Sequence, residues 1–167
     1  MNELKPPDVH HFHAACGWME LGNQAEAWLE WGLISPENRA HPAVLDLQWS
    51  LYLGEKNWDE AFRVAQQLMV VLPDNPAAWL HSAYALRRMQ GGGLESAQAL
   101  LTPAAEKFPE EPVIVFNLAC YACQLNQLDE ARRWFARACE IGGQKEIRAM
   151  ALADEDLKLL WPEIRGA

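Results

Sequence analysis

Residues 42–75 read PAVLDLQWSLYLGEKNWDEAFRVAQQLMVVLPDN, and this stretch decides the fold. Pro42 precedes an apolar run, where it suits the first turn of a helix because its missing N–H would have no partner there. A short polar turn follows, and Ala61 then lies in a second amphipathic segment. Pro73 ends that segment, because the residue before a proline avoids helical geometry. The stretch therefore predicts two helices joined by a turn.

The same unit recurs along the chain at nearly constant intervals. Alanines that open the second segment are separated by 34, 36 and 34 residues, and they are Ala27, Ala61, Ala97 and Ala131. The prolines that open the first segment are separated by 34 and 36 residues, and they are Pro42, Pro76 and Pro112. Gly91–Gly93 supplies the two extra residues of the long interval. A period of this length is typical of a helical repeat array.

The pattern resembles the tetratricopeptide repeat, W-x2-L-G-x2-Y followed by A-x3-F and P, which forms a helix–turn–helix of 34 residues. Ala131 and Phe135 reproduce A-x3-F, and Trp79 fills the leading aromatic position. The resemblance implies an all-α, right-handed superhelical solenoid. We assign one domain over residues 1–167, with repeats at 8–41, 42–75, 76–111 and 112–145 and a C-terminal cap at 146–167. After Gly142 and Gly143 we expect a helix near 144–153 and a second near 154–161 that begins at Asp154.

In proteins of this family the first helix of each repeat lines a concave groove. Carried over copy by copy, the candidate peptide-binding residues are Phe12, His13, Cys16, Met19, Asp46, Leu47, Ser50, Leu53, Leu80, His81, Tyr84, Arg87, Arg88, Phe116, Asn117, Cys120 and Gln124. Their mostly apolar and aromatic character predicts anchoring of a peptide or helix, with Arg88 available for a carboxylate. The resemblance thus implies a non-catalytic interaction module, an adaptor or chaperone, with a protein partner held by apolar anchors.

Two other interpretations remain open. In one, the chain is a structural homo-oligomer whose groove is filled by its own copy or by its C-terminal helices. In the other, His10, His13 and Cys16, spaced three apart on one helix side, bind a metal or do redox chemistry. Asp46, Ser50 and His81 meet the residue types of a nucleophilic triad, but helix interiors offer no free N–H donors for an oxyanion. We interpret them as a polar strip that orients a peptide.

Charge and composition narrow the classes of partner. The formal net charge is −9, the wrong sign for binding nucleic acid. Residues 1–83 contain 4 basic and 11 acidic side chains, so the negative charge lies mainly in that half. The N-terminal residues lack a basic-then-apolar signal pattern, and no apolar run is long enough for a membrane span. We expect a cytoplasmic, bacterial-like protein that needs no cofactor or metal and keeps its four cysteines reduced.

Overall fold

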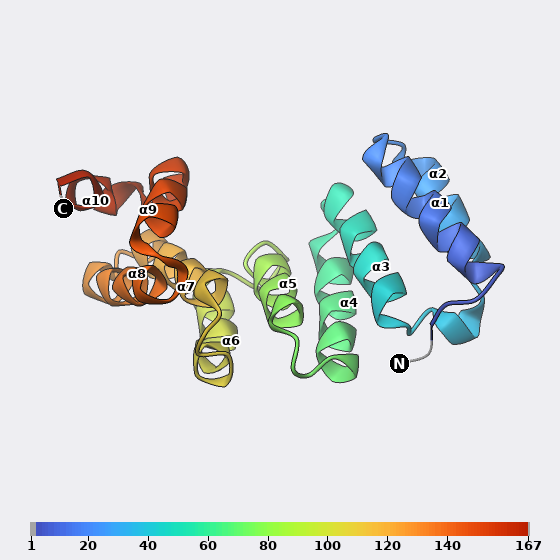
Figure 1. Ribbon diagram of the computed structural model, residues 1–167, viewed down its shortest axis with the longest axis horizontal. Helices are drawn as coiled ribbons and strands as arrows, with labels where there is room; N and C mark the ends of the chain where they lie inside the picture. The colour runs from blue at the N-terminus through green and yellow to red at the C-terminus, as the bar shows by residue number, and fades with distance from the viewer. Residues whose placement is uncertain (1–2, 167) are drawn as a thin grey trace. The chain divides into compact units, whose positions relative to one another are not determined.

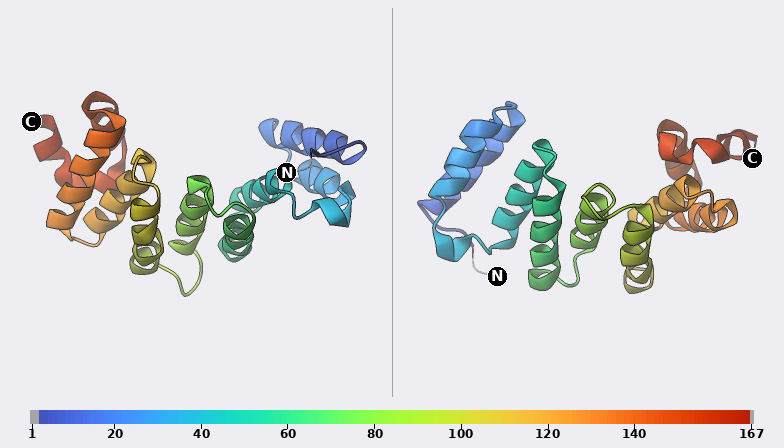
Figure 2. Two further views of the ribbon diagram at one scale, coloured as in Figure 1. Left: turned by 60° about the horizontal axis from the view of Figure 1, so that its bottom comes forward. Right: turned by 180° about the vertical axis from the view of Figure 1, so that it is seen from behind.

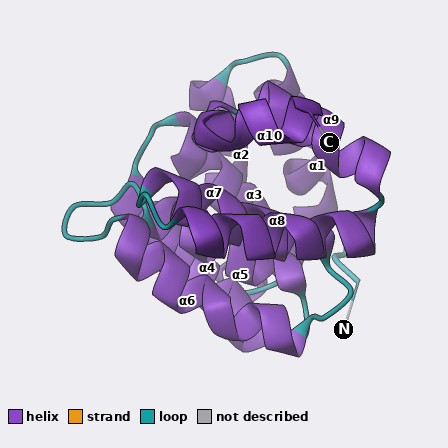
Figure 3. Cartoon of the chain, turned by 90° about the vertical axis from the view of Figure 1, so that its left-hand side faces the viewer, coloured by secondary structure: helices purple, strands orange, loops and turns teal. Residues whose placement is uncertain are grey.

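The computed structural model describes residues 3–166 and folds them into a series of helices joined by short turns (Figure 1). No β-strand occurs in this part of the chain, as Figure 3 shows. In chain order the helices are α1 (Asp8–Glu20), α2 (Gln24–Leu33), the 3₁₀ turn η1 (Pro36–Asn38), α3 (Pro42–Gly54), α4 (Trp58–Val71), α5 (Pro76–Leu86), α6 (Leu94–Lys107), α7 (Pro112–Gln124), α8 (Leu128–Gly142), α9 (Gln144–Ala153), the 3₁₀ helix η2 (Glu155–Leu160) and α10 (Trp161–Gly166).

Packing is most extensive within three pairs of consecutive helices. These pairs are α7 with α8, α3 with α4, and α1 with α2. Figure 2 shows α3 and α4 lying side by side from two further directions. The packing divides the chain into two compact units, the first ending at Ala85 and the second beginning at Leu86.

The turn inside a helix pair is built the same way in three of the four pairs. A residue with positive φ ends the first helix, Gly22 at 74°, Lys56 at 57° or Asn126 at 60°. The next N–H then reaches back to a carbonyl five residues earlier, as in Asn57 N to Tyr52 O at 2.9 Å. This is the hydrogen bond of a Schellman motif, which satisfies a carbonyl at the helix end. The same backbone turn therefore recurs with the sequence repeat.

The first two pairs share a side-chain cap as well. Asn23 Oδ1 accepts from the N–H of Glu26 at 3.3 Å, and Asn57 Oδ1 accepts from the N–H of Glu60 at 3.4 Å. Asparagine is a favoured N-cap because its side chain satisfies one of the orphan N–H groups of the first turn. These caps fix the starts of α2 and α4.

The turn between α5 and α6 is built differently. Gly93 N donates to Leu86 O at 3.1 Å, which closes the glycine loop against the end of α5. A Cβ placed on Gly92 would lie 1.9 Å from that same carbonyl oxygen, so only glycine fits there. The glycine loop thus lengthens this turn, and α5, with 11 residues, ends earlier than α1, α3 and α7, which have 13 residues each.

The repeated alanines explain how closely the helices approach. The side chains found at the 34- to 36-residue interval have 0% exposure, and they are Ala27, Ala61, Ala97 and Ala131. A methyl group at the crossing point lets two helix backbones come together, and larger apolar side chains fill the remaining space. In the first unit those side chains include Leu45, Val64 and Leu68.

Asp8 joins the start of α1 to the segment after α2. Its carboxylate accepts from Ser35 N and Ser35 Oγ, both at 3.0 Å, and from Asn38 Nδ2 at 2.6 Å. The side chain is 2% exposed, so these hydrogen bonds replace its lost solvation. The Asn38 hydrogen bond first, and the Ser35 N–H second, hold the pKa of Asp8 below its ordinary value because both favour the charged form.

The C-terminal segment of the second unit folds back over α7. Asp154 begins η2 by accepting from Asp156 N at 2.9 Å, and Leu157 and Leu160 are buried at 0% and 1% exposure. Trp161 Nε1 donates to Ala151 O at 2.8 Å, which ties α10 to α9. The segment expected at 154–161 is thus present and begins at Asp154, but its geometry is 3₁₀ rather than α.

Candidate functional site

Two adjacent cavities lie on the first-helix side of the first unit. The α1–α3 cavity has a volume of ≈ 290 Å³ and lies between the helices for which it is named. It is lined by Phe12, Cys16, Met19, Glu20, Ala43, Asp46, Leu47 and Ser50. Six of these eight residues belong to the peptide-binding set predicted from the sequence.

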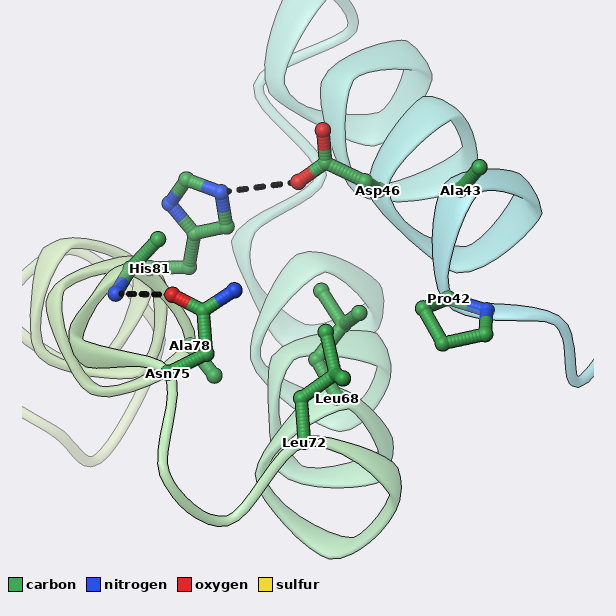
Figure 4. Close-up of a pocket in the computed structure, with 9 residues that line it drawn as sticks. Pro42, Ala43, Asp46, Leu68, Leu72, Asn75, Ala78 and His81 are labelled. Carbon is green, nitrogen blue, oxygen red and sulfur yellow. Dashed lines mark hydrogen bonds and ion pairs between the residues drawn. The ribbon is translucent and has the colours of Figure 1, made fainter. Parts of the chain in front are cut away.

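The α3–α5 cavity lies on the other side of α3 and has a volume of ≈ 440 Å³ (Figure 4). It is lined by Pro42, Ala43, Asp46, Leu68, Leu72, Asn75, Ala77, Ala78 and His81. Leu68 and Leu72 rise from the end of α4 to form its apolar floor, while Asp46 and His81 form its polar rim. Ala43 and Asp46 line both cavities, so one turn of α3 forms the wall between them.

The polar rim is held by contacts among three aromatic or charged side chains. His81 Nε2 lies 3.0 Å from Asp46 Oδ1, and the imidazole stacks on Trp49 with ring centroids 3.7 Å apart. Trp49 is itself buried at 8% exposure, so it offers a fixed surface for the imidazole. His81 on α5 and Asp46 on α3 are therefore in direct contact.

Ser50 does not join them in a catalytic arrangement. Its hydroxyl donates to Asp46 O at 3.0 Å, a bond to the preceding turn of its own helix. A nucleophilic triad requires the hydroxyl to donate to the imidazole instead. Ser50, Asp46 and His81 thus present a polar strip along the cavities, with no Ser–His hydrogen bond.

Negative charge acts on the α1–α3 cavity. Burial is the main cause that raises the pKa of the Cys16 thiol, and the carboxylates of Glu20 and Asp46 raise it further. Both carboxylates line the cavity, and Cys16 is its half-buried thiol. The lining of the α1–α3 cavity therefore disfavours an added negative charge.

In the second unit, the equivalent positions are occupied by the chain itself. Arg87 Nη1 donates to Asp156 Oδ2 at 2.9 Å, and Arg87 Nη2 donates to Gln124 Oε1 at 2.9 Å. Gln124 also hydrogen-bonds Asp156, and Cys120 Sγ lies 3.7 Å from Asp154 Oδ2. Three predicted groove residues, Arg87, Cys120 and Gln124, thus contact the C-terminal segment, and Gln124 stays exposed in a cavity that it lines with Asp156.

The other predicted residues fall into different environments. Phe116 is buried at 5% exposure and belongs to the interior of the second unit. Leu53 packs against the core of the first unit, and Asn117 Nδ2 donates to Val113 O in its own helix at 2.8 Å. The four remaining predicted residues are half-buried or exposed and line neither cavity, and they are His13, Leu80, Tyr84 and Arg88.

The metal interpretation receives no geometric support. In residues 3–166 no group of three or more His, Cys, Asp or Glu side chains is arranged to hold a metal ion, and His10, His13 and Cys16 are included in that range. His11, their neighbour, contacts Glu30 at 2.8 Å. A search of the same residues finds no helix long and apolar enough to cross a membrane.

Several site residues lay outside the sequence prediction. Ala43 and Ala78 line the cavities from first helices but at positions outside the predicted set, and Leu68 and Leu72 line one of them from the end of α4. Trp49 follows Asp46 by one helical turn, which is the signal that would have placed it beside the polar strip. The ends of second helices were not considered as groove walls, and Leu68 shows that they contribute.

Comparison with known proteins identifies the fold. No protein-family model matches the chain, and no curated protein matches its sequence. Among solved structures, "MamA RS-1 ArsTM double mutant" is similar with a TM-score of 0.70 and 15% identity, covering 85% of this chain and 79% of that one. TTC0263, a thermophilic TPR protein in Thermus thermophilus, is similar with a TM-score of 0.65 and 15% identity, covering 96% of this chain and 100% of that one. The chain therefore has the all-α helical-repeat fold of tetratricopeptide-repeat proteins, as its sequence period predicted.

Proposed function

We propose that the chain is a non-catalytic protein-interaction module that binds a peptide segment of a partner protein along α1, α3 and α5. The observation that carries this proposal is the pair of cavities that share Ala43 and Asp46. Together they form two apolar hollows beside one polar strip, the arrangement that receives alternate side chains of a bound segment. An adaptor or chaperone in the cytoplasm, where unpaired thiols stay reduced, is the role we assign.

The second unit supports placing the site in the first. Its first-helix positions already contact Asp154 and Asp156 of the same chain. A partner segment would have to displace those contacts, whereas the two cavities of the first unit are lined without them. Binding at the first unit therefore does not require breaking hydrogen bonds to the C-terminal segment.

The test uses a random dodecapeptide library displayed on phage and selected on the immobilised full chain. Selected peptides are synthesised, and their affinities for the wild type and two variants are measured by fluorescence anisotropy. Ala43→Phe fills the shared wall of both cavities, and Ala136→Phe adds the same side chain at an exposed site on α8. We expect Ala43→Phe to weaken binding about tenfold or more, ~1.4 kcal/mol, and Ala136→Phe to leave it unchanged.

A footprint on the wild type gives an independent measurement. Cys16 is half-buried and lines the α1–α3 cavity, while Cys120, Cys123 and Cys139 are buried. Iodoacetamide should therefore alkylate Cys16 first, and a peptide bound in the groove should slow that reaction. Failure to select any peptide, or peptides that neither protect Cys16 nor discriminate Ala43→Phe, would overturn the proposal.

Self-association is a separate outcome of the same design. If sedimentation velocity shows a concentration-dependent oligomer that Ala43→Phe dissociates and Ala136→Phe does not, the occupant of the groove is a second copy of the chain. The peptide proposal would then be replaced by the homo-oligomer interpretation.

A further inference from the structure

The three helices that border the proposed groove carry an uneven set of charges. Helices α1, α3 and α5 contain no lysine or arginine between them. Their acidic residues are Asp8, Glu20 and Asp46. Basic residues elsewhere in the first unit lie outside these helices, and Arg63 is paired with Glu60 on α4. The groove and the rest of the first unit therefore both carry a net negative charge.

The three carboxylates are not equivalent. Asp8 is buried and saturated by Ser35 and Asn38, so it offers nothing to a partner. Asp46 keeps 60% of its side chain exposed and contacts His81 through Oδ1 alone. Among residues 3–166 no hydrogen bond reaches Asp46 Oδ2. One carboxylate oxygen therefore remains available at the wall between the two cavities.

Glu20 adds a second negative charge on the same side. It lines the α1–α3 cavity with Asp46 and is exposed at the end of α1. After burial, these two carboxylates are the causes that raise the pKa of Cys16, which lies between them in the cavity lining. A cationic group entering here would meet both.

In the second unit the charges are reversed, and the charged groove residue already has a partner from the same chain. There the charged groove residue is Arg87, and the group that meets it is the carboxylate of Asp156 from the C-terminal segment. Arg87 is 16% exposed and Asp156 is 26% exposed, so the pair is largely covered. Within the described part of the first unit, no lysine or arginine forms an ion pair with Asp46.

We propose that the segment bound by the first unit is cationic, with a lysine or arginine side chain meeting Asp46 between apolar side chains that enter the two cavities. This inference rests on the proposed peptide-binding function and names the chemistry of its partner. The Asp46 carboxylate, with Glu20 in the lining of the same α1–α3 cavity, gives selectivity because it attracts a basic segment and repels an acidic one.

The test extends the library selection. Peptides selected on the wild type should be enriched in Lys and Arg over the unselected library, and selection on Asp46→Lys should lose that enrichment. A double-mutant cycle then pairs a selected peptide and its Lys→Gln analogue with wild type and Asp46→Asn. The isosteric amide still accepts a hydrogen bond from His81, so the groove is preserved. Asp59→Asn removes the same charge from an exposed site on α4 and serves as the control.

We expect the Lys→Gln change to weaken binding to the wild type and to Asp59→Asn by about two- to fivefold, the range of a partly exposed ion pair. With Asp46→Asn the same change should have almost no effect. Peptides that protect Cys16 and discriminate Ala43→Phe, yet show no basic enrichment or lose equal affinity with Asp46→Asn and wild type, would overturn the cationic proposal while leaving peptide binding intact. Absence of any binding peptide would instead refute the proposed function.

Discussion

The imidazole of His81 lies flat on the indole of Trp49, with ring centroids 3.7 Å apart and planes inclined by 9°. Tyr84 meets the same indole edge-on, with centroids 6.3 Å apart. Because Trp49 is on α3 and both partners are on α5, the indole joins two successive first helices. It also holds His81 within reach of Asp46.

Removal of this indole should destabilise the first unit and loosen the polar strip. Trp49→Ala deletes a side chain that is 8% exposed, and we expect a loss of ~3–5 kcal/mol in the free energy of unfolding. Trp49→Phe should cost less, because it keeps an aromatic face and removes an indole N–H that is buried without a hydrogen-bond partner. Urea unfolding followed by circular dichroism measures both. Equal losses for the two variants would contradict the stacking role.

Asp8 should make stability depend on pH. Its folded pKa is lowered by hydrogen bonds from Asn38 and Ser35, so its contribution is complete above the unfolded pKa and disappears as the pH falls through the folded pKa. Asp8→Ala should therefore lower the melting temperature at neutral pH, and the gap to wild type should close in acid. Thermal unfolding across acidic pH tests this.

A matched acidic residue separates the Asp8 network from general charge effects. Asp59→Ala removes an exposed carboxylate in the same unit, and it should leave the slope of stability against pH close to that of the wild type. If Asp8→Ala and Asp59→Ala change the acid limb of the profile equally, the network is not responsible.

Two glycines should respond in opposite directions to the same substitution. At Gly92 a Cβ would lie 1.9 Å from Leu86 O, so Gly92→Ala must displace backbone, and we expect a loss of ~1–3 kcal/mol. At Gly17, inside α1, a Cβ meets nothing within 4 Å. Gly17→Ala should therefore stabilise by ~0.5–1 kcal/mol through helix propensity. Chemical denaturation of both variants decides the matter, and a neutral Gly92→Ala would show that the loop is not closed on α5.

The Arg87–Asp156 ion pair should couple the C-terminal segment to the rest of the second unit. Both side chains are largely covered, and Asp156 also engages Gln124. A double-mutant cycle of Arg87→Ala and Asp156→Ala should give a coupling free energy of ~1–3 kcal/mol, as for hydrogen bonds to charged groups. Hydrogen exchange in α7 should rise in either single variant. Additive losses would mean that the two residues act independently.

The helix-pair architecture could be predicted because the residues that begin and end each helix recur with the repeat and interact with near neighbours in the sequence. Asn75 lies directly before Pro76 and accepts from Ala77 N at 3.0 Å, and Asp154 caps η2. Such caps involve residues two or three apart, so the sequence contains the whole interaction. The glycine run could be assigned to a turn for the same reason.

The site was less predictable because its contacts are distant in sequence. Arg87 and Asp156 are 69 residues apart, and nothing local to either residue indicates that they meet. The repeat pattern placed Phe116 and Cys120 on a groove-lining helix, but it has no information on what covers that helix. The position of a residue within a repeat indicates which face of the helix it occupies. Whether that face is exposed depends on which other segment of the chain packs on it.

The covering of α7 by η2 also limits how this array can change in length. Asp154 and Asp156 meet Cys120 and Arg87 only while α9 follows directly after α8. A repeat duplicated ahead of α5 leaves those contacts in place, whereas one inserted between α8 and α9 separates the acidic segment from Cys120 and Arg87. The chain can therefore gain repeats toward its N-terminal side without remaking its end, and engineered extensions should be inserted there.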